Sequence, residues 1–239
     1  MTIAVIDVRA GEPIISALSR EGFLVVTLPA CERLPVATAS HPDMLLMRLG
    51  DISFTEALYR RENAAVFDKL KALLPEMKIC SVEHPLGDRY PTDCRLNALL
   101  MGDKLFIKSD TASPEISEKA AELGIKIISV KQGYPACTVL ALGESHAITS
   151  DRGMAAALRA EGIEVLLIDN GGILLPPYEY GFIGGAAGVY GKKVYFLGDI
   201  STHKCSSEIC SFCRAAGYEP ISLADGPLRD LGRIIFIDP

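Results

Sequence analysis

Several polar residues stand shortly before apolar stretches that end at Gly50, Gly102 and Gly143. They lie five, seven or nine positions ahead of their glycine, and the alternation of a β-strand would place them on one face. Charged side chains are rarely buried without a partner. We therefore expect either a ligand site or a network of aspartate and arginine that ties neighbouring units together. The set comprises His41, Asp43, Asp93, Arg95, Asn97, Tyr134 and Thr138.

Two cysteines accompany this set and could serve as nucleophiles. A thiolate at Cys137 or Cys94 could attack a carbon centre, with His41 as the nearest proton carrier. Both cysteines stand an even number of positions ahead of their glycine, eight for Cys94 and six for Cys137, whereas the polar set stands at odd numbers. In a strand this opposite parity would point them to the other face, under the helices, as small apolar groups. Pro91 and Pro135 can disturb the alternation, so both interpretations stay open.

Two further patterns suggest chemistry only weakly. The spacing of His203, Cys205, Cys210 and Cys213 fits no common zinc or iron–sulfur pattern, and on a helix Cys205, Cys213 and their neighbours form a buried stripe. The glycines of the segment 184–188 precede a hairpin, whereas a nucleotide loop should open a helix. We expect these glycines to let the backbone approach the centre of the molecule or a ligand. We predict no metal and no cofactor.

The elements that would position these residues recur along the chain. Each apolar stretch ends at a glycine suited to a tight turn and is followed by a second strand, a helix and a third strand. The predicted hairpins turn at Gly50, Gly102, Gly143 and Gly191. Helix ends are expected before Gly124, Gly162 and Gly217. The alternative is an open doubly wound α/β sheet, which would not place a glycine hairpin before every helix.

The two ends of the chain complete the pattern. Residues 1–29 read as strand, helix and strand without a first strand, and residues 231–239 form an orphan strand of the required kind. Pairing the two ends abolishes a free sheet edge. We therefore predict a single α/β domain over residues 1–239, a five-fold pseudo-symmetric ββαβ propeller. Its repeats span 231–239 plus 1–29, 41–84, 91–130, 135–169 and 181–223.

Five ββαβ units in a ring resemble the penteins, a superfamily of guanidino-group-modifying enzymes that also includes a non-catalytic ribosome anti-association factor. The segments His41-Pro42-Asp43 and Tyr90-Pro91-Thr92-Asp93 look like the family's entry to a repeat. The resemblance implies that such aspartates hold a guanidinium group. It also implies a cysteine opening the last repeat and a histidine near residues 134–142, and this sequence has neither there.

Composition and charge argue against nucleic-acid binding and a membrane-spanning helix. The net charge of −6 over 239 residues argues against nucleic-acid binding, which favours a basic surface. No run approaches the roughly 18 apolar residues of a membrane span, and the N-terminus lacks signal-peptide character. Seven cysteines are expected as free thiols in the cytoplasm. We predict a small guanidino or amino-acid-like ligand in the central cleft, bound by a non-classical amidine hydrolase or transferase or by a binding protein. The alternative is a non-catalytic ring with a macromolecular partner, and self-association is left open.

Overall fold

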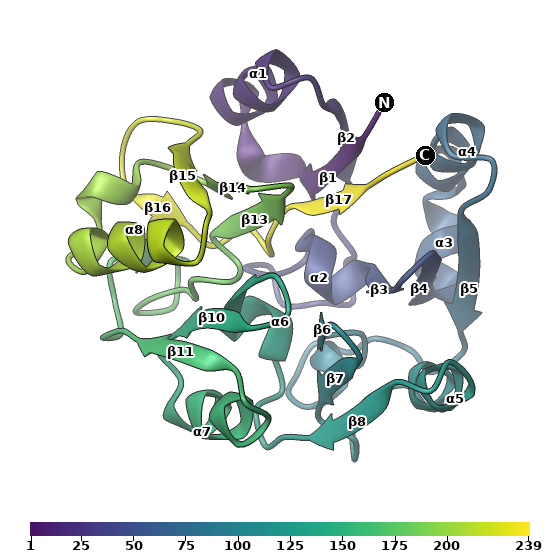
Figure 1. The fold of residues 1–239 in the computed structure, drawn as a ribbon. Coiled ribbons are helices and arrows are strands. Elements are labelled where there is room, and N and C mark those ends of the chain that lie inside the picture. The colour runs from purple at the N-terminus through teal and green to yellow at the C-terminus, as the bar shows by residue number, and fades with distance from the viewer.

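The computed structural model describes residues 1–239 as a mixed α/β fold with five three-stranded sheets (Figure 1). In each sheet the middle strand pairs antiparallel with one neighbour and parallel with the other. The sheets are β17 (Ile235–Ile237), β1 (Ile3–Asp7) and β2 (Leu24–Leu28); β3 (Met47–Leu49), β4 (Ile52–Glu56) and β5 (Lys78–Val82); β6 (Ala98–Met101), β7 (Lys104–Ile107) and β8 (Lys126–Ser129); β9 (Val139–Leu142), β10 (His146–Thr149) and β11 (Glu164–Leu167); and β13 (Ala187–Tyr190), β14 (Lys193–Phe196) and β15 (Glu219–Ser222).

The hairpin glycines predicted from the sequence are confirmed. Gly50, Gly102, Gly143 and Gly191 each join the first and second strands of a sheet, and their φ angles lie between 58° and 67°. This left-handed region is accessible to glycine without the steric cost that a Cβ atom brings. The four hairpins therefore fix where each first strand ends.

Helices connect the second strand of each sheet to the third, and Figure 1 shows them on the outside of the molecule. Helix ends at the predicted glycines are confirmed, since Gly124, Gly162 and Gly217 follow α5, α7 and α8 with positive φ. The helices are α1 (Glu12–Arg20), α3 (Ala57–Glu62), α4 (Ala64–Leu73), α5 (Pro114–Glu122), α7 (Arg152–Ala160) and α8 (Ser206–Ala215), with short 3-10 turns η1 (Val8–Ala10) and η3 (Ile200–Thr202).

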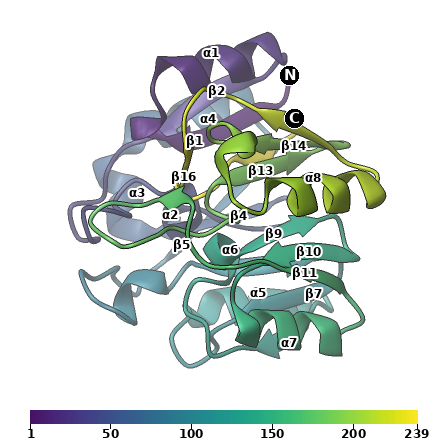
Figure 2. The same ribbon diagram turned by 90° about the vertical axis from the view of Figure 1, so that its left-hand side faces the viewer.

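The two ends of the chain meet in one sheet, as predicted. Strand β17 pairs antiparallel with β1, with Ile3 opposite Ile237 and Val5 opposite Ile235. Figure 1 shows the two termini side by side at the end of this pair. A further two-stranded sheet joins β12 (Ile173–Leu174) to β16 (Leu228–Arg229). This sheet joins the long segment between β11 and β13 to the C-terminal segment. Figure 2 shows the segment between β11 and β13 in green, on the side of the molecule away from α8.

The prediction of extended backbone ahead of the first strands is wrong. Asp43, Asp93 and Thr138 lie on three short helical turns, α2 (Pro42–Leu45), η2 (Thr92–Cys94) and α6 (Pro135–Thr138). The other polar residues flank these turns, and the strands begin only after them. Pro42 and Pro135 occupy the first helical positions, where the fixed φ of proline favours a helical turn. The period of two therefore does not apply to these residues, and the parity argument for the cysteines fails.

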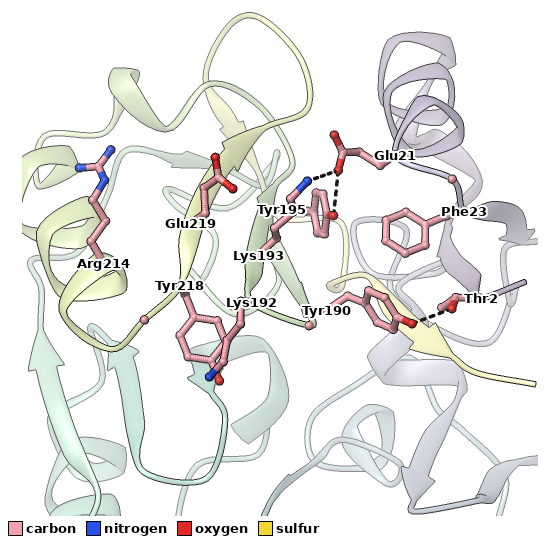
Figure 3. A pocket seen from close by; sticks show the side chains of 13 residues that line it. Thr2, Glu21, Phe23, Tyr190, Lys192, Lys193, Tyr195, Arg214, Tyr218 and Glu219 are labelled. Carbon is pink, nitrogen blue, oxygen red and sulfur yellow. Dashed lines mark hydrogen bonds and ion pairs between the residues drawn. The ribbon is translucent and has the colours of Figure 1, made fainter.

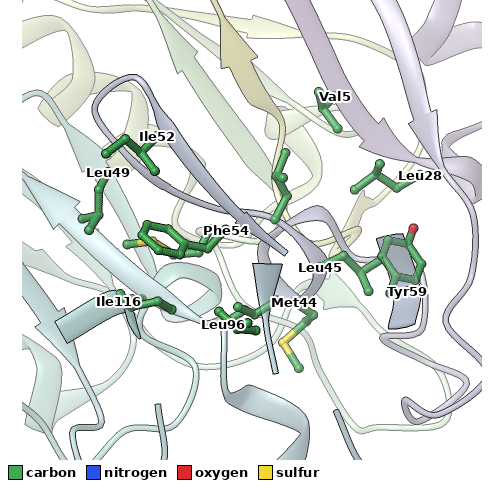
Figure 4. Close-up of a cluster of buried hydrophobic side chains, with 14 of the residues drawn as sticks. Val5, Leu28, Met44, Leu45, Leu49, Ile52, Phe54, Tyr59, Leu96 and Ile116 are labelled. Carbon is green, nitrogen blue, oxygen red and sulfur yellow. The ribbon is translucent and has the colours of Figure 1, made fainter. Parts of the chain in front are cut away.

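The largest buried cluster surrounds these turns (Figure 4). Met44 and Leu45 of α2 are fully buried and pack in one cluster with Phe54 of the same unit and with Leu96 and Ile116 of the next. Truncating such a residue to alanine costs roughly 2–5 kcal/mol. The turn that carries His41 and Asp43 is thus anchored by its own apolar side chains. No helix is long and apolar enough to cross a membrane.

Candidate functional site

Cys137 and Asp43 form the centre of a buried polar group. The Cys137 thiol donates a hydrogen bond to Asp43 Oδ2 at 2.9 Å, although the two residues are 94 positions apart. Burial and the nearby Asp43 raise the pKa of the Cys137 thiol well above its ordinary value. Of the two interpretations left open by the sequence, the structure shows the one in which Cys137 joins the polar set, because the α6 turn directs its thiol to Asp43.

Asn97 braces this pair from a third unit of the chain. Its side-chain oxygen accepts a hydrogen bond from the Ala136 backbone N–H at 2.8 Å. Its amide group donates to the Asp43 carbonyl at 3.3 Å and to Cys137 Sγ at 3.2 Å. Asn97, predicted as a ligand residue, thus lies beneath the site and links the α2 and α6 turns.

His41 lies beside the pair and is completely buried. Neither of its ring nitrogens has a hydrogen-bond partner, and Nδ1 lies 3.8 Å from Asp230 Oδ1. Burial lowers the pKa of this histidine, so the neutral imidazole is favoured. One donor atom each of His41, Asp43 and Cys137 lies within 4.8 Å of the others.

Asp230 belongs to the site although sequence reasoning missed it. Its carboxylate accepts hydrogen bonds from the backbone N–H groups of Phe182 at 2.8 Å and Gly232 at 3.1 Å. Burial raises its pKa to about 6. A Cβ atom on Gly185 would lie 1.9 Å from Asp230 Oδ1, so that glycine allows the close approach expected of the 184–188 segment. The glycine run predicted a close approach, but nothing in the sequence identified Asp230 as the residue that makes it.

A cavity of about 400 Å³ opens onto this group. Tyr134 donates a hydrogen bond to Asp93 Oδ2 at 2.7 Å, while Asp93 Oδ1 has no partner. Burial raises the pKa of Asp93. No lysine or arginine lines this cavity. Its walls are Thr38, His41, Asp93, Tyr134, Cys137, Leu175, Tyr178, Glu179, Tyr180, Phe182 and Asp230.

Asp43 faces a second cavity of about 320 Å³, together with Arg233. Arg233 is the only residue other than glycine with positive φ, at 61°. Its buried guanidinium has a lowered pKa because of desolvation, which the nearby Asp43 and Cys137 partly offset. Burial also raises the pKa of Asp43 to about 6, against the attraction of Arg233. Nothing in the sequence singled out Arg233, which lies just before the apolar strand β17.

The other predicted site residues lie outside the first cavity. Arg95 donates to the Thr111 carbonyl at 3.5 Å, and the Thr138 hydroxyl donates to the Tyr134 carbonyl at 2.9 Å within its own turn. The Cys94 thiol donates to the Pro91 carbonyl at 3.2 Å, and burial raises its pKa to about 12. The structure therefore brings Cys137, and not Cys94, next to Asp43 and His41.

Of the cysteines near the C-terminus, Cys213 packs as the sequence predicts. It is buried together with Ile209 on one face of α8. His203 has partners on both ring nitrogens, the Gly171 carbonyl at 3.0 Å and the Cys205 backbone N–H at 3.1 Å. These bonds engage both atoms through which His203 could bind an ion.

A surface hollow of about 770 Å³ lies between the first and last units of the chain (Figure 3). Two of its charges are paired, since Lys193 donates to Glu21 at 2.8 Å, and Tyr195 donates to the same carboxylate at 3.0 Å. Lys192 lies over the Tyr218 ring at 4.7 Å from its centroid. None of the buried polar residues described above lines it.

Comparison with solved structures places the fold among the penteins. The chain is similar to a cysteine-to-serine mutant of DDAH from Pseudomonas aeruginosa complexed with citrulline, at 13% identity and a TM-score of 0.60, covering 92% of this chain and 90% of that one. A dimethylarginine dimethylaminohydrolase adduct with 4-chloro-2-hydroxymethylpyridine gives 13% identity and a TM-score of 0.58 over 92% and 90% of the two chains. The amidinotransferase SxtG from Microseira wollei gives 14% and 0.54 over 87% and 74%.

At these identities the likeness concerns the fold. No curated protein sequence matches the chain. A family model described as a family of unknown function, DUF6873, matches residues 5–235. The chain therefore belongs to the DUF6873 family and has the pentein fold.

Proposed function

We propose that the chain binds a small cation of amidine or guanidino type in the cavity bounded by Asp93, Tyr134 and Asp230. The observation that carries the proposal is the charge of the walls. Three carboxyl groups, those of Asp93, Glu179 and Asp230, line the cavity without any lysine or arginine. Such a cavity attracts a cation and repels an anion.

The geometry around Asp93 favours a planar ligand with several donors. Oδ2 accepts from Tyr134, and the free Oδ1 offers a buried acceptor. A guanidinium or amidinium presents parallel N–H groups that suit a carboxylate. Aromatic faces also attract cations, and the cavity walls include Tyr134, Tyr178, Tyr180 and Phe182.

The fold supports this ligand class. One solved structure with the same fold holds citrulline, and another is an adduct with S-methyl-L-thiocitrulline. We extend this likeness to the architecture and propose that the five ββαβ units form one pseudo-symmetric pentein-like propeller domain over residues 1–239. All seven cysteines are free thiols, which supports the cytoplasm as the proposed location.

A catalytic form of this proposal assigns the nucleophile to Cys137 and proton transfer to His41. Both line the cavity. In the free protein Cys137 carries its proton, because burial and Asp43 raise its pKa. A bound cation favours the thiolate by Coulomb attraction, so ligand binding and activation of Cys137 would be coupled.

Ligand-induced stabilisation tests the proposal. A ligand that binds the folded state raises the melting temperature. At 100 times its Kd it stabilises the folded state by about 2.7 kcal/mol. We expect agmatine, arginine or a related amidine to raise it, and Asp93→Asn to weaken binding at least about tenfold. Asp225→Asn, an exposed carboxylate, is the matched control and should bind as the native protein does.

Absence of a shift with every amidine at millimolar concentration would contradict the proposal and favour the macromolecular alternative. Equal affinity of Asp93→Asn and the native protein would contradict the assigned cavity.

A further inference from the structure

We propose that His41, Asp43 and Cys137 form a binding site for a divalent transition-metal ion, with zinc preferred. The three side chains each place one donor atom within 4.8 Å of the other two, and all three are buried. Imidazole and thiolate with one carboxylate suit zinc or cobalt, whereas magnesium and calcium prefer oxygen donors throughout. An ion bound here would occupy the Cys137 thiolate and the His41 ring, so the metal-bound form is an alternative to the catalytic form proposed above and does not require the amidine ligand.

The unpartnered His41 ring points to an ion. Its two nitrogens are buried and lack any hydrogen-bond partner in the protein. A buried polar group without a partner lowers stability, and an ion is one of the partners that explain such a group. Nδ1 lies 3.8 Å from Asp230 Oδ1. This distance is too long for a hydrogen bond, so either ring nitrogen is available to an ion.

Asp43 and Cys137 supply the two anionic donors. Asp43 Oδ1 has no partner, and Asp43 Oδ2 holds the thiol proton of Cys137 at a donor–acceptor distance of 2.9 Å. Metal binding replaces this proton: the S–H bond breaks, a sulfur–metal bond forms, and the proton leaves to solvent. Zinc donors bind at about 2.0–2.3 Å, so the side chains must close slightly around the ion.

The surrounding charges suit a dication. The positive charges of the ion and of the half-buried Arg233 would be balanced by the Cys137 thiolate and the carboxylates of Asp43 and Asp230, which are buried. A buried charge needs such compensation. Three protein ligands leave a fourth tetrahedral position. His41 and Cys137 line the 400 Å³ cavity, so the open position faces that cavity.

This site has no recognisable spacing in the sequence. Two donors stand two positions apart, and the third follows 94 positions after Asp43. Short zinc motifs bring ligands together on one or two local elements, whereas these ligands meet only when the α2 and α6 turns pack together.

Titration of the metal-free full-length protein with cobalt(II) alone tests the site. We expect one equivalent to bind, with a thiolate-to-cobalt charge-transfer band in the near ultraviolet and release of the Cys137 proton. Zinc should displace the cobalt. Cys137→Ser should abolish the band, and His41→Gln or Asp43→Asn should weaken binding at least about tenfold. Cys94→Ser is the matched control, a buried cysteine outside the donor set, and should keep the band.

A second measurement uses only the native protein, in case a variant fails to fold. Zinc should protect Cys137 from alkylation, as read by peptide mass spectrometry, and leave the labelling of Cys80 unchanged. Absence of a band and of protection would overturn the proposal. A band that survives in folded Cys137→Ser would also overturn it. Because these titrations contain metal alone, failure of amidines to bind does not affect their outcome.

Discussion

Asn97 gives the most direct test of how the centre of this molecule is held together. It is 1% exposed and connects three segments of the chain through its side-chain amide. Asn97→Ala leaves the buried Ala136 N–H without an acceptor and removes donors from the Asp43 carbonyl and from Cys137 Sγ.

The size of the effect follows from these contacts. A buried backbone group without a partner costs about 1–3 kcal/mol, and each further hydrogen bond contributes about 1 kcal/mol. We therefore expect Asn97→Ala to lower the free energy of unfolding by about 2–5 kcal/mol. In a protein of this size each kcal/mol shifts the melting temperature by about 2–4 °C, so the melting temperature should fall by roughly 4–20 °C.

Urea denaturation followed by circular dichroism measures this difference. Asn63→Ala is the control. The Asn63 amide donates to the Tyr59 carbonyl at 3.0 Å, and that carbonyl also accepts the Asn63 backbone N–H. Its loss leaves no orphaned group, and we expect a change below about 1 kcal/mol. If both variants lie within about 0.5 kcal/mol of the native protein, the bracing role of Asn97 is refuted.

Three further predictions concern the same site. Gly185→Ala places a Cβ atom 1.9 Å from Asp230 Oδ1 and should lower the free energy of unfolding by about 2–4 kcal/mol. The control Gly153→Ala, at an exposed helical position, should not lower it. Equal melting temperatures of Gly185→Ala and the native protein would contradict the close approach. Burial raises the pKa of Asp230 in the folded protein to about 6 from its ordinary value of 3.8, so its contribution to stability is present at low pH and lost as the pH rises through about 6. Asp230→Asn should therefore gain on the order of 3 kcal/mol relative to the native protein between pH 4 and pH 7, whereas a pH-independent difference in urea denaturation would argue against the raised pKa. In the metal-free protein iodoacetamide should label Cys137 after the partly exposed thiols of Cys80, Cys205 and Cys210. The reason is that the Cys137 thiol is buried and has a raised pKa. Preferential labelling of Cys137 over those three thiols would refute this prediction.

Local signals in the sequence determined the succession of strands, hairpins and helices. Gly50 and Gly143 occupy turns whose positive φ favours glycine, and apolar periodicity marks the buried faces of the helices. The pairing of β1 with β17 was also predictable, because a strand without a partner stood at each end of the chain. Asp43 and Asp93 were recognisable because charged residues rarely stand beside buried strands without a function or a partner.

The same local reasoning failed where the backbone changes from helix to strand. Pro42 and Pro135 begin helical turns, and a helical turn rotates successive side chains by about 100° where a strand would alternate them. Strand alternation alone would therefore have pointed Cys137 under the helices, and the proline at a first helical position was the signal that the alternation did not apply.

Only the tertiary structure decided which residues share the site. Cys137 meets Asp43 across 94 residues, and Asp230 reaches His41 from the opposite end of the chain, at 3.8 Å. Arg233 enters beside them from the approach to β17. These distances depend on how separate turns pack around a common centre, and no residue's nearest neighbours in sequence carry that information. The sequence thus determined the elements and most of the polar candidates, while packing selected the His41, Asp43 and Cys137 group and left Arg95 and Cys94 outside it.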